Sequence, residues 1–259
     1  MSVWLTGVCL ICGASIGLLG GILGIGGGMI VIPGLVLLMD MPQQLAQGTA
    51  LVMVLPAITL AVRKYNQRSR IDRRAAGAGA ASAVLFTWVG AKLALGIPSS
   101  TLRISFAVFL FFVATFYVYR TMKPQRSAPS NSAMPARSGP MLTPVRAAAL
   151  GIVSGTLGGF FGVGGAILVV LILTAVFRFS QTSAQALALT MVIPGSTIAL
   201  VTYSWAGQAN WWIGVPLAVG SLLFVPVGVR IAFRLPERKL RMCFAAMLFA
   251  TVALLIAEA

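Results

Sequence analysis

The sequence predicts an all-α integral membrane protein built from two inverted-topology repeats. Each repeat has about five hydrophobic segments, with a helix break at a glycine-rich motif. Three observations predict this fold class: the apolar composition, an internal repeat, and the opposite placement of basic residues in the two halves. Hydrophobic residues make up 59% of the 259 residues and charged residues only 9%, with a mean hydropathy of +0.97. An ordinary soluble domain is far less apolar.

The apolar segments set the first level of organisation. A membrane-spanning helix needs about 20 mostly apolar residues, and the runs in this chain are apolar on every side, unlike alternating barrel strands. Helices are therefore expected. In the first half the segments are 3–23, 28–39, 49–62, 75–97 and 104–120.

The second half repeats the first. Residues 13–107 align with residues 151–245 at a constant offset of 138 without a gap, and about a third of the aligned pairs are identical. Such similarity indicates duplication of a whole unit. We therefore predict a first transmembrane repeat over 1–120, a cytoplasmic linker over 121–146 that is rich in Pro and Ser, and a second transmembrane repeat over 147–259.

Basic residues predict the orientation of the repeats. The loop 63–74 is rich in Lys and Arg, whereas its repeat mate 201–212 has none and carries three tryptophans. Because basic residues concentrate in cytoplasmic loops, the first loop should lie inside and its mate outside. The net charge of +15 then reflects orientation and anionic lipid, and nucleic acid is not expected as a partner. A multi-pass protein of the cell inner (plasma) membrane follows.

Two glycine clusters interrupt the hydrophobic stretches and predict helix breaks. The short apolar run after each cluster is too short to span a bilayer. A helix that begins after such a break points unpaired N–H groups and the positive end of its dipole at the gap, which suits an anion. The glycines expected at the substrate are Gly24, Gly26, Gly27, Gly28, Gly162, Gly164 and Gly165. Whether the first two segments of each repeat span fully or form a re-entrant hairpin stays open.

Other glycines favour packing. Gly13, Gly17 and Gly21 recur at four-residue spacing, the pattern by which membrane helices approach each other closely.

Uncharged polar residues near the breaks could donate hydrogen bonds to an anion. The candidates for substrate binding are Gln47, Thr49, Gln185 and Thr190, with Thr59, Ser196 and Thr197 as further hydroxyls. Gln47 and Gln185 occupy the same repeat position, so we expect them to face each other across a pseudo-two-fold axis. The alternative is that these side chains only bridge helices.

Catalysis and metal binding are not expected. The chain has no histidine, four acidic residues and three cysteines, which provides no nucleophile with an adjacent base and no metal-ligand cluster. We predict that the protein is not an enzyme and needs no cofactor.

The doubled motif, GLLGGILGIGGGMIVIP and GTLGGFFGVGGAILVV, resembles the TauE/SafE sulfite exporter family, also called the toluenesulfonate uptake permeases. The resemblance covers nearly the whole chain. It implies a secondary transporter of a small sulfur-containing anion such as sulfite, sulfoacetate or another sulfonate. Export is favoured because the membrane potential drives an anion outward by about 2.3 kcal/mol per charge per 100 mV. A channel-like anion pore, an importer of organosulfonates or thiosulfate, and a monomer or homodimer remain alternatives.

Overall fold

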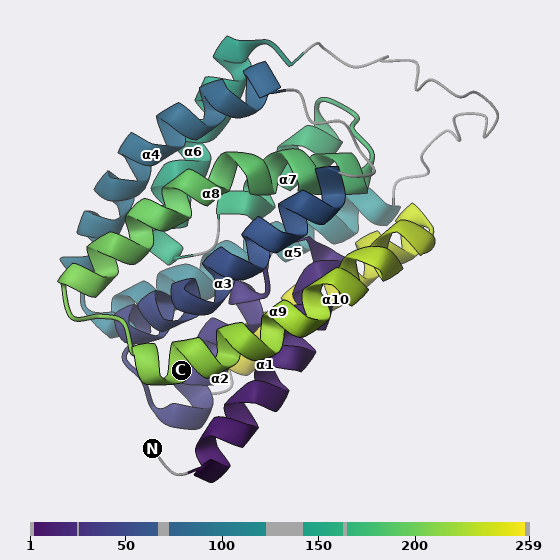
Figure 1. The fold of residues 1–259 in the computed structure, drawn as a ribbon. Helices are drawn as coiled ribbons and strands as arrows, with labels where there is room; N and C mark the ends of the chain where they lie inside the picture. Colours follow the sequence, from purple (N-terminus) through teal and green to yellow (C-terminus); the bar gives the residue numbers. More distant parts are fainter. Residues whose placement is uncertain (1–2, 25, 67–72, 123–141, 163–164, 257–259) are drawn as a thin grey trace.

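The computed structural model describes residues 3–24, 26–66, 73–122, 142–162 and 165–256. The described elements are α-helices, drawn in Figure 1. The first repeat contains α1 (Val3–Leu23), α2 (Gly28–Met39), α3 (Gln43–Asn66), α4 (Arg73–Leu95) and α5 (Ser99–Met122). The second contains α6 (Pro144–Phe161), α7 (Gly165–Ala175), α8 (Gln181–Trp205), α9 (Trp211–Arg234) and α10 (Glu237–Ile256).

The helices fit a membrane. Within the described residues, seven helices are long and apolar enough to cross a bilayer by length and composition, and α2 and α7 are among the shorter apolar ones. The predicted five segments per repeat match these helices in number and order.

Two helices begin earlier than hydropathy predicted: α3 starts at Gln43 rather than residue 49, and α5 at Ser99 rather than residue 104. The added turn of α3 is polar, but Gln43 and Gln47 are buried against protein. Hydropathy alone does not detect a polar turn of this kind.

The two repeats interlock. Helix α1 packs along α9, and its repeat mate α6 packs along α4, so the first helix of each repeat lies against the fourth helix of the other. Figure 1 shows these pairs on opposite sides of the molecule, with α3 and α8 between them. Neither repeat therefore buries its helices alone.

Small residues make the close contacts in these pairs. Along α1, Gly13 faces Leu217 and Gly17 faces Ser221 of α9, and a Cβ on Gly17 would lie 2.5 Å from the Ser221 Cα. The repeat-related glycines of α6 meet α4 backbone in the same order. The packing role expected for Gly13, Gly17 and Gly21 is confirmed.

Helices α3 and α8 run in opposite directions. Gln47, near the start of α3, bonds Tyr203 near the end of α8, and Tyr65, near the end of α3, bonds Gln185 near the start of α8. Since α3 and α8 are equivalent helices of the two repeats, this is the arrangement expected for inverted repeats.

Candidate functional site

The first glycine break separates α1 from α2. Helix α1 ends at Leu23 and α2 begins at Gly28. Gly24, Gly26 and Gly27 have φ angles of 65°, 73° and 81°, in the left-handed region that residues with a Cβ rarely adopt. The glycines therefore let the chain leave one helix and enter the next.

The second break repeats this geometry. Helix α6 ends at Phe161, Gly162 caps it with φ 78°, and α7 begins at Gly165. Both predicted helix breaks are thus present. Gly164, predicted to contact the substrate, lies outside the described residues.

At the first break, Gln185 of α8 closes the end of α1. Its amide Nε2 donates to the Leu23 carbonyl at 2.6 Å, and its Oε1 accepts from the Tyr65 hydroxyl at 3.0 Å. The same hydroxyl lies 3.1 Å from the Gly21 carbonyl. A Cβ on Gly24 would lie 2.5 Å from the Gln185 amide carbon, so this glycine also makes room for the glutamine. Both ends of the Gln185 amide are satisfied.

At the second break, Gln47 of α3 takes the equivalent place but is not fully satisfied. Its Oε1 accepts from the Tyr203 hydroxyl at 2.8 Å, and that hydroxyl lies 3.1 Å from the Gly159 carbonyl. A Cβ on Gly162 would be 3.1 Å from the Gln47 Cβ. The Gln47 side chain has 0% exposure, yet its Nε2 has no hydrogen-bond partner among the described residues. A buried donor without a partner costs about 1 to 3 kcal/mol.

The two glutamines do not face each other, contrary to the expectation from the repeat. Gln185 contacts Tyr65, which is 18 positions beyond Gln47 on α3, or about 27 Å of helix. Each glutamine lies instead at the glycine break of the opposite repeat. The inverted arrangement therefore creates two separate candidate sites.

The predicted threonines have partners of their own. The Thr49 hydroxyl oxygen accepts from the Asn210 backbone N–H at 3.0 Å, which ties the loop before α9 to α3. The Thr190 hydroxyl donates to the Ala186 carbonyl at 2.7 Å, one turn earlier in its own helix. Neither of these hydrogen bonds involves a residue of a glycine break.

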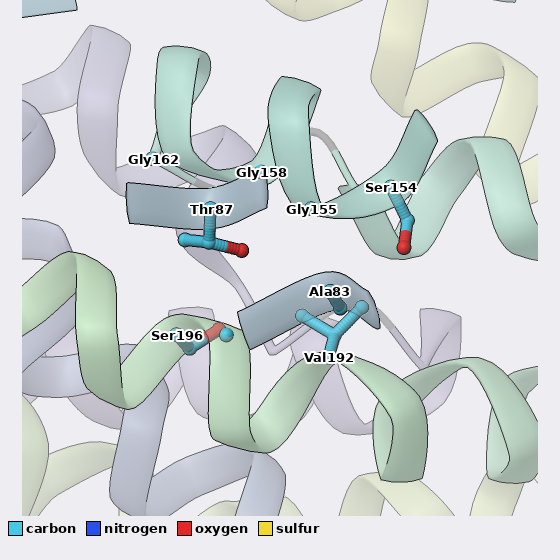
Figure 2. Close-up of a pocket in the computed structure, with 9 residues that line it drawn as sticks. Ala83, Thr87, Ser154, Gly155, Gly158, Gly162, Val192 and Ser196 are labelled. Atoms are coloured by element: carbon cyan, nitrogen blue, oxygen red, sulfur yellow. The ribbon is translucent and has the colours of Figure 1, made fainter. Parts of the chain in front are cut away.

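A small pocket lies beside the second break, between α4, α6 and α8 (Figure 2). Thr87 of α4 and Ser196 of α8 line it and project toward it. Ser154 also lines it and donates to the Gly151 carbonyl at 3.2 Å. The lining residues, none of them charged, are Ala83, Thr87, Ser154, Gly155, Gly158, Gly162, Val192, Gly195 and Ser196.

The sequence patterns pointed to Gly162 and Ser196 but not to Thr87 and Ser154. Their positions in α4 and α6 read as ordinary packing faces. A signal was present in the repeat itself: the mate of Thr87 is Val225, and the mate of Ser154 is Ile16. A hydroxyl where the duplicated unit has an aliphatic side chain marks a place where the two copies differ in polarity.

The chemistry available at this site is hydrogen-bond donation by neutral groups. Amides and hydroxyls can bind the oxygens of an anion without carrying a compensating charge. Within the described part of the chain, no three His, Cys, Asp or Glu side chains gather where they could hold a metal ion.

Comparison with known proteins places the chain among membrane transporters. The family model described as "Sulfite exporter TauE/SafE" matches residues 9–255. The chain is 26% identical to the probable membrane transporter protein YdhB of Bacillus subtilis, over 86% of this chain and 88% of that protein. It is 24% identical to the probable membrane transporter protein YunE of the same organism, over 86% and 87%. It is 23% identical to the probable membrane transporter protein MJ0441 of Methanocaldococcus jannaschii, over 92% and 91%. No solved structure matches the chain at a significant level.

Proposed function

Because the chain belongs to the TauE/SafE sulfite exporter family and is a multi-pass membrane protein, we propose that it exports a small sulfur-containing anion, such as sulfite, sulfoacetate or another sulfonate. The substrate binds at a glycine break, where a helix end and neutral donors converge. Transport, rather than catalysis, is the class of function shared by its relatives.

The observation that carries this proposal is the unpartnered amide of Gln47 beside Gly162. A buried N–H without an acceptor is unfavourable, and an oxyanion supplies the missing acceptor. Helix α7 begins three residues after Gly162, and the positive end of its dipole adds a favourable field for negative charge.

Neutral donors suit a transporter. A fixed positive side chain would hold an anion tightly, whereas hydrogen bonds to a charged group contribute about 1.5 to 3 kcal/mol each. The lining residues of the pocket beside Gly162 are uncharged. The bound anion can therefore leave again, which transport requires.

The direction of transport follows from the electric field. A cytoplasm at negative potential expels a monoanion with about 2.3 kcal/mol per charge per 100 mV. Export through this protein thus needs no coupling ion. We place the protein in the inner (plasma) membrane, with the basic loop 63–74 in the cytoplasm.

Efflux from proteoliposomes tests the proposal. Vesicles loaded with [³⁵S]sulfite should lose label faster with the protein than without it, and the rate should saturate with sulfite concentration. An inside-negative potassium diffusion potential should accelerate efflux. Purified protein should also show a higher melting temperature with sulfite, thiosulfate or sulfoacetate, since a ligand stabilises the state it binds. A wild-type protein that neither binds nor moves any of these anions would contradict the proposal, and a rate that never saturates would indicate a pore.

A further inference from the structure

We propose that the two glycine breaks have different roles: the break at Gly162 binds the transported oxyanion, and the repeat-related break at Gly24 is a closed structural joint. The donors at the binding break are Gln47, Thr87 and Ser196. This inference rests on the proposed transport of a small anion, and it assigns that substrate to one of two sites that the duplication made equivalent.

The glutamine amides provide the first difference. Gln185 Nε2 donates to the Leu23 carbonyl at the first break, whereas Gln47 Nε2, at the same repeat position, has no partner in the described chain. Gln47 is fully buried, and its side chain lies against Gly162. Because Gln185 Nε2 donates to Leu23, its Oε1 faces the hydroxyl of Tyr65. The Oε1 of Gln47 faces the hydroxyl of Tyr203 in the same way. At the first break the Leu23 carbonyl accepts from the glutamine amide, whereas at the second break the Gln47 N–H has no such acceptor among the described residues.

A neighbouring amide on α3 repeats the pattern. Gln43, one turn before Gln47, is 2% exposed, and neither its Nε2 nor its Oε1 has a partner among the described residues. Its repeat mate Gln181 makes an interaction. The start of α3 thus holds two amides with unpartnered atoms, whereas at the start of α8 both ends of the Gln185 amide are hydrogen-bonded.

The pocket residues provide the second difference. Thr87 corresponds to Val225, and Ser196 corresponds to Ile58. Gly195 leaves room for the Thr87 hydroxyl, since a Cβ there would lie 2.6 Å from the Thr87 Oγ1. The second break is lined by hydroxyls where the first has aliphatic side chains.

Those aliphatic side chains cover the first break. A Cβ on Gly27 would lie 2.6 Å from the Ile16 Cγ2, and a Cβ on Gly26 would collide with Ile58. Ile58 is 1% exposed and belongs to the main hydrophobic core. An anion at the first break would lose its hydration without gaining donors, which is costly.

The pocket is narrow in this conformation. The space open to the centre of a water molecule is about 10 Å³, which is what a single water needs. The binding state must therefore separate α6 from α8, and the ligand must be small. Amide and hydroxyl donors select a compact oxyanion whose oxygens accept several hydrogen bonds.

Cysteine accessibility distinguishes the two breaks without depending on the identity of the substrate. In a background with Cys9, Cys12 and Cys243 replaced by alanine, Ser196→Cys and Ile58→Cys report on equivalent positions. The probe is sodium (2-sulfonatoethyl) methanethiosulfonate, a small reagent that itself carries a sulfonate. We expect it to modify Ser196→Cys at least 10-fold faster than Ile58→Cys, and we expect sulfite to slow the first reaction.

The outcomes separate the two proposals. Equal modification of both positions, or faster modification of Ile58→Cys, would overturn the one-sided site. A third outcome is that only Ser196→Cys is modified and that chloride slows the reaction, whereas sulfite, thiosulfate and sulfoacetate do not. This outcome would support the binding site and overturn the sulfur-containing substrate. Modification that no anion slows would overturn binding at this break.

A second pair of variants guards against misfolding of the cysteine variants. Thr87→Val preserves shape and copies the residue of the first repeat, and Val225→Thr makes the reciprocal change. If Thr87 donates to the anion, Thr87→Val should raise the half-saturating sulfite concentration about 10-fold to 150-fold, and Val225→Thr should leave it unchanged. Thr156→Val is the matched control, since the hydroxyl of this threonine donates to the Ile152 carbonyl of its own helix. Equal effects of Thr87→Val and Thr156→Val would contradict the inference.

Discussion

The hydroxyl of Tyr203 donates to the Oε1 of Gln47 at 2.8 Å, although 156 positions separate the two residues. The repeat-related bond from Tyr65 to Gln185 measures 3.0 Å. Each bond joins the end of one central helix to the start of the other, so the two hydrogen bonds link α3 and α8 at both ends. Both tyrosines are fully buried, and their hydroxyls also reach the carbonyls of Gly21 and Gly159.

The first prediction concerns these tyrosines. Tyr203→Phe should lower the free energy of unfolding by about 1 to 3 kcal/mol, because a buried amide oxygen loses its donor. Thermal unfolding in detergent measures the loss. A double-mutant cycle with Gln47→Leu should give a coupling energy, since the residues are in contact, whereas Tyr203→Phe with Gln185→Leu should be additive. Additivity in both cycles would show that the bond does not contribute to stability.

The second prediction concerns the glycine of the second break. Gly162→Ala should lower the free energy of unfolding by about 1 to 2 kcal/mol, the cost of the left-handed conformation for a residue with a Cβ, and the new methyl group would press on Gln47. Gly34→Ala is the control, because Gly34 lies inside α2 with nothing within 4 Å of a Cβ. It should be neutral or stabilising by up to about 1 kcal/mol. Equal melting temperatures for the two variants would contradict a strained break.

Much of the fold could be predicted from the sequence because apolar length and repetition are properties of the chain itself. The ten helices of the described residues, the breaks after Leu23 and Phe161, and the packing glycines of α1 all follow from such patterns. The partner of each helix could not be predicted. Interlocking of α1 with α9 and of α6 with α4 depends on three-dimensional packing, which the duplication alone does not specify.

The site was less predictable for the same reason. Equal repeat positions suggested equal roles for Gln47 and Gln185, but hydrogen bonding differs between them because their surroundings differ. Thr49 was expected at the substrate, and the bond of its hydroxyl oxygen to the loop before α9 could not be predicted from the sequence. The positions that differ between the repeats, Thr87 above all, carried more information about the site than the identical ones.

The third prediction separates structural from binding hydroxyls. Thr49→Val should lower the free energy of unfolding by about 1 to 3 kcal/mol, since the Asn210 N–H loses its acceptor, and should leave the half-saturating sulfite concentration unchanged. Thr49→Ser keeps the acceptor and should behave as wild type. A melting temperature that is unaffected by Thr49→Val, with weaker sulfite binding, would instead return Thr49 to the substrate site.

The fourth prediction concerns orientation. Asn66 and Trp205 are exposed residues at the ends of α3 and α8, and these helices run in opposite directions. In the cysteine-free background, an impermeant maleimide should label Trp205→Cys in intact cells, and Asn66→Cys only after the membrane is opened. The basic loop after α3 sets this polarity. Labelling of both positions from the same side would rule out inverted repeats in the membrane.

The last prediction sets the two glutamines against each other. Gln47→Leu removes an N–H that has no partner among the described residues and leaves Tyr203 a second acceptor at Gly159. Gln185→Leu instead breaks bonds to both Leu23 and Tyr65. Gln47→Leu should therefore mainly weaken sulfite binding, and Gln185→Leu should mainly lower stability, although the two residues are repeat mates.

We expect Gln47→Leu to raise the sulfite dissociation constant about 10-fold to 150-fold, the loss of one hydrogen bond to a charged group. Its melting temperature should change little, because the substitution also removes the cost of a buried unpaired donor. Gln185→Leu should lower the free energy of unfolding by about 2 to 4 kcal/mol for two lost bonds to buried partners, with the dissociation constant of the folded fraction close to wild type. Gln47→Glu should bind worse still, because it places a carboxylate beside the anion. Thermal unfolding and sulfite titration of the same purified samples measure both quantities, and equal loss of affinity in Gln47→Leu and Gln185→Leu would show that the two breaks share the substrate.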